Sequence, residues 1–132
     1  MSNLEKYYRS GLSNSLLFKD NGKLSHNGPW SPVNTNTVID RLFLGDFFAA
    51  EYTVAVDLDN LNKEIIKCTL VATTNDANLV VYSRNSTLTK LVELSARVND
   101  SYAELLISPA TPKAEGAKYI CTAQLFQTQN PL

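Results

Sequence analysis

Hydrophobic and polar residues alternate one by one over much of this chain, most clearly just after Gly45-Asp46. Between residues 49 and 56, one face carries Tyr52, Val54 and Val56, and the other carries Glu51, Thr53 and Ala55. Side chains alternate across a β-strand, whereas a helix repeats every 3.6 residues. The pattern therefore predicts a half-buried strand that opens near Phe47, with Phe47, Ala50 and Tyr52 as core or corner residues.

The same alternation recurs along the rest of the chain. It predicts strands at residues 37–44, 49–56, 65–73, 79–83, 91–98, 102–108 and 118–126. Asp- and Asn-rich turns separate several of them, Asn99-Asp100-Ser101 predicts a tight hairpin, and Pro109 and Pro112 interrupt strand pairing. Consecutive antiparallel strands with short turns usually close as two packed sheets. We expect an all-β fold: an antiparallel β-sandwich, jelly-roll-like or Greek-key, of about seven to eight strands.

The first 34 residues differ in composition from the rest of the chain, because most of them are small or polar. We expect an extended N-terminal arm at residues 1–34 and the β-sandwich domain at residues 35–132. Asp20-Asn21-Gly22 favours a short hairpin within the arm. The arm also carries apolar residues that either pack on their own domain or dock on a neighbouring subunit or partner: Tyr7, Tyr8, Leu16, Leu17, Phe18 and Trp30.

Composition narrows the class of protein. The chain has 132 residues, of which 44% are hydrophobic and 19% charged, with a formal net charge of -1. These values are typical of one soluble globular domain and give no electrostatic footprint for nucleic acid or an anionic membrane. No apolar run reaches the ~20 residues of a membrane span, and the N-terminus lacks the layout of a signal peptide. We therefore expect the chain to fold in a cytoplasm.

The two cysteines, Cys68 and Cys121, each lie within an alternating apolar segment. Both are expected to point into the core as free thiols, since a core of this size needs no covalent link. A disulfide remains the alternative if the two strands face each other.

Residues with catalytic chemistry are sparse. The only histidine, His26, is expected in an exposed loop without partners for metal binding or general-base catalysis. Four glutamates could supply a hydrolytic pair, but all are expected on outward strand positions: Glu51, Glu64, Glu93 and Glu104. No catalytic residue, metal ligand or cofactor site is predicted, and a hydrolase is the weakest of the hypotheses.

Two features of the sequence suggest alternative ligands, calcium and a sugar. The turn Asp57-Leu58-Asp59-Asn60-Leu61-Asn62 could ligate calcium, but it lacks the glycine and closing glutamate of an EF-hand, which favours an ordinary Asx-rich turn. Several tyrosines could stack on sugars, although interior aromatics are more common: Tyr52, Tyr82, Tyr102 and Tyr119.

The run Phe47-Phe48-Ala49-Ala50-Glu51-Tyr52, leading into Thr-Val-Ala-Val, resembles a recurrent β-domain of tailed-phage structural proteins, especially those of T4-like marine cyanophages. Further similar elements follow in order over residues 38–126: Ile65 to Val71, Leu79-Val80-Val81-Tyr82, Ser86-Thr87-Leu88, Val92 to Val98, Tyr102 to Pro109 and the strand through Tyr119. The chain departs from the family at Thr73-Thr74, where a His-Asp pair is frequent, and at Ser83, where glycine is common.

The resemblance implies a non-enzymatic virion component, such as a neck, tail or fibre module or a capsid decoration, made in the host cytoplasm. Its implied partners are further copies of itself, in a homo-oligomer, and other virion proteins. The alternative is a carbohydrate-binding β-sandwich that uses surface tyrosines and Trp30 to hold a host-surface glycan.

Overall fold

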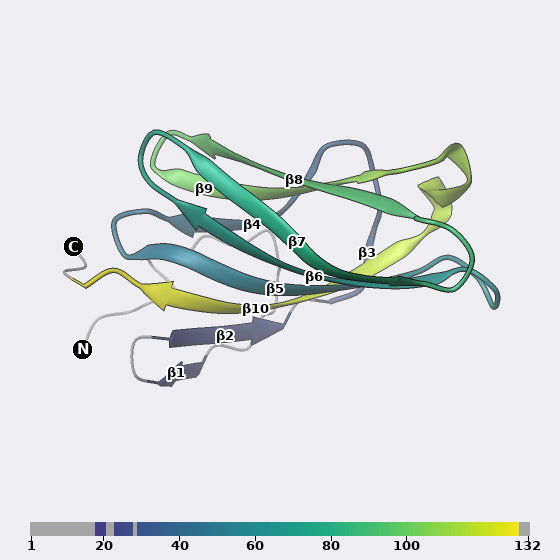
Figure 1. Cartoon of the computed structure of the whole chain (residues 1–132), viewed down its shortest axis with the longest axis horizontal. Helices are drawn as coiled ribbons and strands as arrows, with labels where there is room; N and C mark the ends of the chain where they lie inside the picture. The colour runs from purple at the N-terminus through teal and green to yellow at the C-terminus, as the bar shows by residue number, and fades with distance from the viewer. Residues whose placement is uncertain (1–17, 21–22, 28, 130–132) are drawn as a thin grey trace.

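The computed structural model of the chain describes residues 18–20, 23–27 and 29–129. These residues form ten strands and one short 3-10 helix, arranged as two antiparallel sheets packed face to face (Figure 1). The predicted antiparallel β-sandwich is confirmed. Among the described residues, no helix combines the length and apolar character needed to cross a membrane.

The larger sheet has the strand order β1-β2-β10-β5-β6-β7, and a short strand, β3, also pairs with β10. Its strands are β1 (Phe18–Asp20), β2 (Lys23–Asn27), β3 (Ser31–Pro32), β10 (Lys118–Gln127), β5 (Phe47–Asp57), β6 (Lys63–Ala72) and β7 (Ala77–Ser86). The smaller sheet has the order β4-β9-β8. Its strands are β4 (Thr37–Phe43), β9 (Tyr102–Pro109) and β8 (Val92–Asn99), and the 3-10 helix η1 (Pro112–Gly116) connects β9 to β10.

Strand β5 lies within the larger sheet between β10 and β6 and has the phase that alternation predicts. Phe47, Ala50 and Tyr52 are buried, as expected, while Glu51 faces solvent. The core between the sheets is built from such alternating positions of both sheets. Its largest fully buried side chains are Tyr52, Phe47, Ile39, Leu42, Ile66, Leu70, Leu91, Leu105, Ile107 and Leu125.

The seven predicted strands correspond to β4 to β10, and the hairpin at Asp100-Ser101 is confirmed by the Asn99–Tyr102 pair. One local prediction was wrong. Strand β7 runs from Ala77 to Ser86 instead of residues 79–83, because an edge strand exposed on both sides can include polar residues that otherwise indicate a loop. The segment from Pro112, where strand pairing is interrupted, forms the 3-10 turn η1.

Part of the leader belongs to the larger sheet. Strands β1 and β2 pair antiparallel, which confirms the predicted hairpin, and β2 and β3 both pair with β10. In Figure 1, β1 and β2 therefore continue the larger sheet beyond β10. His26 was expected in a loop, but its backbone lies in β2 opposite Ala123.

Two of the four glutamates are buried, Glu64 and Glu104. The outward position expected for Glu64 was wrong, whereas Glu104 does lie at an outward position but is not exposed. Strand β6 begins two residues earlier than predicted, and Glu64 therefore shares the inward face of Ile66. Glu104 faces away from the core, but Arg41 and Arg97 from the two neighbouring strands cover it. Their Nε atoms lie 3.1 and 2.7 Å from its carboxylate oxygens.

A register shift in β4 gives the core a polar contact. Between Val38 and Asp40 the pairing with β9 slips by one residue, so Ile39 and Asp40 are both buried. The Tyr52 hydroxyl, from the opposite sheet, donates a hydrogen bond of 2.8 Å to Asp40 Oδ2. This bond links the two sheets through the middle of the core.

Both cysteines are buried and free, as expected. Cys68 of β6 lies opposite Tyr52 of β5, and Cys121 of β10 lies opposite Val54 of the same strand. Strand β5 thus separates the two thiols. Burial raises the pKa of Cys68 to about 12, and burial together with the nearby Asp40 raises the pKa of Cys121 well above its ordinary value.

Candidate functional site

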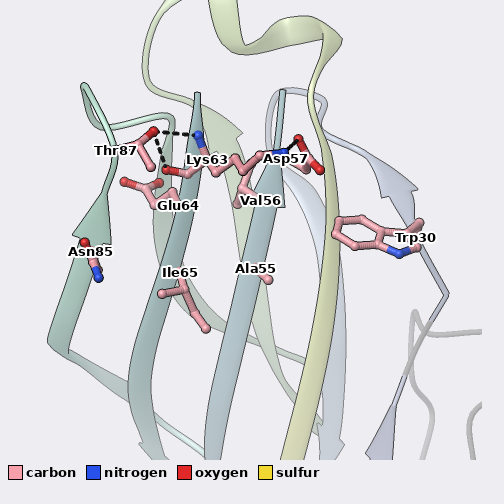
Figure 2. Close-up of a pocket in the computed structure, with 9 residues that line it drawn as sticks. All are labelled: Trp30, Ala55, Val56, Asp57, Lys63, Glu64, Ile65, Asn85 and Thr87. Atoms are coloured by element: carbon pink, nitrogen blue, oxygen red, sulfur yellow. Dashed lines mark hydrogen bonds and ion pairs between the residues drawn. The ribbon is translucent and has the colours of Figure 1, made fainter. Parts of the chain in front are cut away.

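The outer face of the larger sheet is hollowed at the end where β5 turns into β6. The hollow has a volume of about 300 Å³, and its lining includes Trp30, Ala55, Ile65 and Asn85. Figure 2 shows Ala55 and Ile65 on neighbouring strands, between Trp30 on one side and Asn85 on the other. The short side chain of Ala55 leaves the depression between its larger neighbours.

Trp30 also borders a second hollow, of about 330 Å³, lined by Asp57, Leu58, Gly116 and Lys118. The indole is 51% exposed, which is a large fraction for tryptophan. It immediately precedes β3, whose Ser31 pairs with Tyr119 of β10. This pairing holds the residue after Trp30 against the sheet.

Charged and hydroxyl groups form the rim of the first hollow. Lys63 Nζ donates a hydrogen bond of 2.9 Å to Asp57 Oδ1, and both side chains are about half exposed. The Thr87 hydroxyl accepts a hydrogen bond of 3.0 Å from the Lys63 N–H (Figure 2). It also donates one of 2.7 Å to the Leu61 carbonyl. The rim therefore offers hydrogen-bond donors and acceptors beside an apolar floor.

The acidic turn next to this rim is an Asx turn. The Asp59 carboxylate accepts hydrogen bonds of 2.9 Å from the backbone N–H groups of Leu61 and Asn62 and from the Asn62 amide. These bonds, that of the Asn62 side chain foremost, lower the pKa of Asp59. The expected Asx-rich turn is confirmed, and among the described residues no group of three or more His, Cys, Asp or Glu side chains could hold a metal ion.

Buried Glu64 connects the two sheets behind the hollow. Arg84 Nη1 lies 2.9 Å from its Oε2, and the Ser86 hydroxyl donates to the same oxygen. The backbone N–H groups of Leu91 and Val92, at the start of the smaller sheet, each donate to Oε1 at 3.3 Å. Glu64 thus has a structural role in which its oxygens are already occupied by donors.

A second candidate surface is the edge formed by β7, which ends the strand order of the larger sheet. Among the described residues, no strand pairs with its outer side. Val80, Val81 and Tyr82 are exposed on it, so Tyr82 is not the interior aromatic that was expected, whereas Tyr52 and Tyr119 are buried. Sequence reasoning missed this edge because the turn-like residues around it concealed the length of the strand.

The predicted docking residues are only partly described. Tyr7, Tyr8, Leu16 and Leu17 lie outside the described residues, and Phe18 is the first residue of β1. Trp30 is exposed beside the hollow, where the sequence could not place it. Its neighbours Ala55, Ile65 and Asn85 come from three different strands, and only the register of the sheet brings them together.

No protein-family model matches the chain, and no curated protein matches it. Among solved structures, it is similar to the crystal structure of the tailspike protein gp49 from Acinetobacter baumannii bacteriophage Fri1, a capsular polysaccharide depolymerase. The sequences are 11% identical and the TM-score is 0.49, over 95% of this chain and 21% of the tailspike chain. The chain therefore spans about one fifth of that protein, and a likeness this distant carries no functional assignment.

Proposed function

We propose that this chain is a non-enzymatic structural protein of a tailed-phage virion, and that it acts by binding further copies of itself and other virion proteins. The sequence resemblance over residues 38–126 supports this proposal, including its finer form, a T4-like marine cyanophage. The observation that carries it is the open edge of β7. The protein would be made in the host cytoplasm and function in the virion.

Edge strands usually carry features that prevent pairing with another chain, such as exposed charges. Two other edges follow this rule: Arg41 of β4 and Arg97 of β8 bind Glu104, but their side chains remain 45% and 54% exposed. The one charged side chain of β7, Arg84, binds buried Glu64 and is only 24% exposed. Strand β7 is thus a long edge strand without a largely exposed charge.

A second copy of the same strand is the partner we favour for this edge. Two β7 strands related by a two-fold axis can pair antiparallel, because each presents the same sequence and the same backbone groups to the other. The stretch Ala77–Ser83 has no charged residue to oppose a like charge across this interface. The exposed side chains of Val80, Val81 and Tyr82 would then become buried.

The test is the molar mass of the full-length protein by light scattering over a concentration series. The wild-type protein is expected to self-associate, and Val81→Lys or Val80→Lys should reduce association, because a lysine on the edge must be desolvated by pairing. Val71→Lys is the matched control: Val71 and Val80 are each 48% exposed, but Val71 lies on β6, which is paired on both sides. A strictly monomeric wild type, or association that survives Val81→Lys, would contradict the proposal.

The N-terminal docking residues need a separate test, because Tyr7, Tyr8, Leu16 and Leu17 all precede β1. Deleting residues 1–17 retains β1, β2 and β3. If the arm docks on a neighbouring subunit, this deletion weakens association further when combined with Val81→Lys. Equal association with and without residues 1–17 would restrict the contact to the β7 edge.

A further inference from the structure

The hollow beside Trp30 belongs to a row of residues that crosses the outer face of the larger sheet. Pairing aligns Ile120 of β10 with Ala55, Ala55 with Ile65, and Ile65 with Asn85. Trp30 stands at the β10 end of this row, because the next residue, Ser31, pairs with Tyr119. An exposed indole, an apolar floor and a terminal amide therefore follow one another across the sheet (Figure 2).

Polar rows lie on both sides of this apolar row. On the side of the β5–β6 turn, pairing aligns Lys118 with Asp57 and Asp57 with Lys63. On the other side, the aligned residues are Thr122, Thr53, Lys67 and Ser83. Each position beside the floor thus offers a hydroxyl, a carboxylate or an ammonium group.

This arrangement matches the chemistry of a sugar ring. A pyranose has an apolar face of C–H groups, which packs on the electron-rich face of an indole, and a rim of hydroxyls that both donate and accept hydrogen bonds. Asp57 can accept from such hydroxyls, while Lys63, Lys118 and the Asn85 amide can donate. The volume of about 300 Å³ is at the lower end for ligand sites.

The length of the row indicates a ligand with more than one ring. Four steps between neighbouring strands, at ~4.8 Å each, make ~19 Å from Trp30 to Asn85. The hollow extends in this direction, since its lining includes residues from Trp30 to Asn85 (Figure 2). A chain of sugar units laid across the strands would contact the indole, the floor at Ala55 and Ile65, and the amide in turn.

We propose that this row is an oligosaccharide-binding site, with one pyranose ring stacked on the exposed indole of Trp30. The site goes beyond the assembly function proposed above and is separate from it, because the β7 residues that carry self-association are Val80, Val81 and Tyr82. A virion protein with such a site would contact glycan on the host surface.

The experiment begins with the full-length protein on a glycan array that carries oligosaccharides of bacterial capsules and lipopolysaccharides. The best-bound oligosaccharide is then titrated against the protein while the indole fluorescence is followed. Trp30 is the single tryptophan of the chain, so the signal reports this site alone. Binding is expected to change the emission, and the monosaccharide unit of the same glycan should bind more weakly.

Calorimetry on variants then locates the binding. Trp30→Ala removes the stacking surface and Ala55→Phe fills the hollow, and each should weaken binding at least about tenfold. Tyr82→Ala is the control, because it removes an exposed aromatic outside the hollow and should leave affinity unchanged. Unchanged circular dichroism and Tm show that each variant is folded.

No binding on the array, or affinity that survives Trp30→Ala or Ala55→Phe, would overturn the proposal, as would an equal loss with Tyr82→Ala. Val81→Lys separates this site from the proposed assembly function. It is expected to lose self-association and to keep its saccharide affinity, so either proposal can fail without the other.

Discussion

Tyr52 is buried in the middle of β5, and its hydroxyl donates a 2.8 Å hydrogen bond to Asp40 from the opposite sheet. Burial, followed by the nearby Asp40, raises the pKa of Tyr52 well above its ordinary value. The hydroxyl thus remains a hydrogen-bond donor at any pH near neutrality. Alternation in the sequence predicted that Tyr52 is buried, but the Asp40 partner depends on the register shift in β4, which no sequence pattern indicates.

Removing this hydroxyl should destabilise the fold. In Tyr52→Phe, Asp40 loses a buried donor, and we expect the free energy of unfolding to fall by about 2 kcal/mol. Urea denaturation measures this value. Tyr82→Phe is the control, because Tyr82 is half exposed and its substitution should change stability far less than that of Tyr52. Equal effects of the two substitutions would contradict the role of the Tyr52 bond.

Replacing Glu64 should lower the free energy of unfolding more than replacing any exposed glutamate. In Glu64→Gln, the carboxylate that receives Arg84, Ser86 and two backbone N–H groups loses its charge. Breaking a buried ion pair typically costs about 3 kcal/mol. Glu93→Gln removes the exposed pair with Lys90 and should cost less than about 0.5 kcal/mol. The same denaturation experiment compares them, and a stability loss confined to Glu93→Gln would refute the assignment.

At the scale of strands, the sequence predicted most of what local alternation controls. Strand positions, the core phase of β5 and the hairpin at Asp100-Ser101 follow from side-chain periodicity and turn chemistry. The candidate site does not, because Trp30, Ala55, Ile65 and Asn85 lie far apart in sequence and meet only through strand pairing. The sequence indicated Trp30 as a possible contact residue, but it could not predict which residues lie beside Trp30 in the folded protein.

The pairing of the leader with β10 leads to a prediction about truncation. Deleting residues 1–34 removes β1, β2 and β3, which leaves the side of β10 opposite β5 without partners. We expect a lower Tm and stronger, non-specific association than for deletion of residues 1–17, which retains these strands. Scanning calorimetry and light scattering measure the two effects. Identical behaviour of the two truncations would show that β2 and β3 add nothing to the sheet.

For the whole molecule, the buried thiols and the buried Tyr52 hydroxyl predict loss of stability at alkaline pH. The pKa of Cys68 is raised from 9.0 to about 12, and the pKa values of Cys121 and Tyr52 are also raised. Because the folded state holds these protons more tightly, their stabilising contribution is full below pH 9 and is lost as pH rises through the folded pKa values.

The measurement is Tm as a function of pH. Between pH 7 and 9 these three groups stay protonated and should not lower the Tm. As pH rises from 9 toward 12, the Tm should fall. In the double variant Cys68→Ala and Cys121→Ala, the decline should be shallower, although Tm at pH 7 is lower because of the lost side-chain volume. A wild-type Tm that does not decline above pH 9 would contradict this prediction.

Because β5 lies between the two thiols, their labelling rates can report local unfolding on each side of this strand separately. Cys68 and Cys121 belong to one buried cluster but to strands on opposite sides of β5. A thiol reagent can modify each one only while its strand is exposed, so the two labelling rates report opening on either side of β5. We expect equal rates by peptide mass spectrometry, because a shared core opens as one unit. Faster labelling of Cys121 would mean that β10 separates first and takes the leader strands with it.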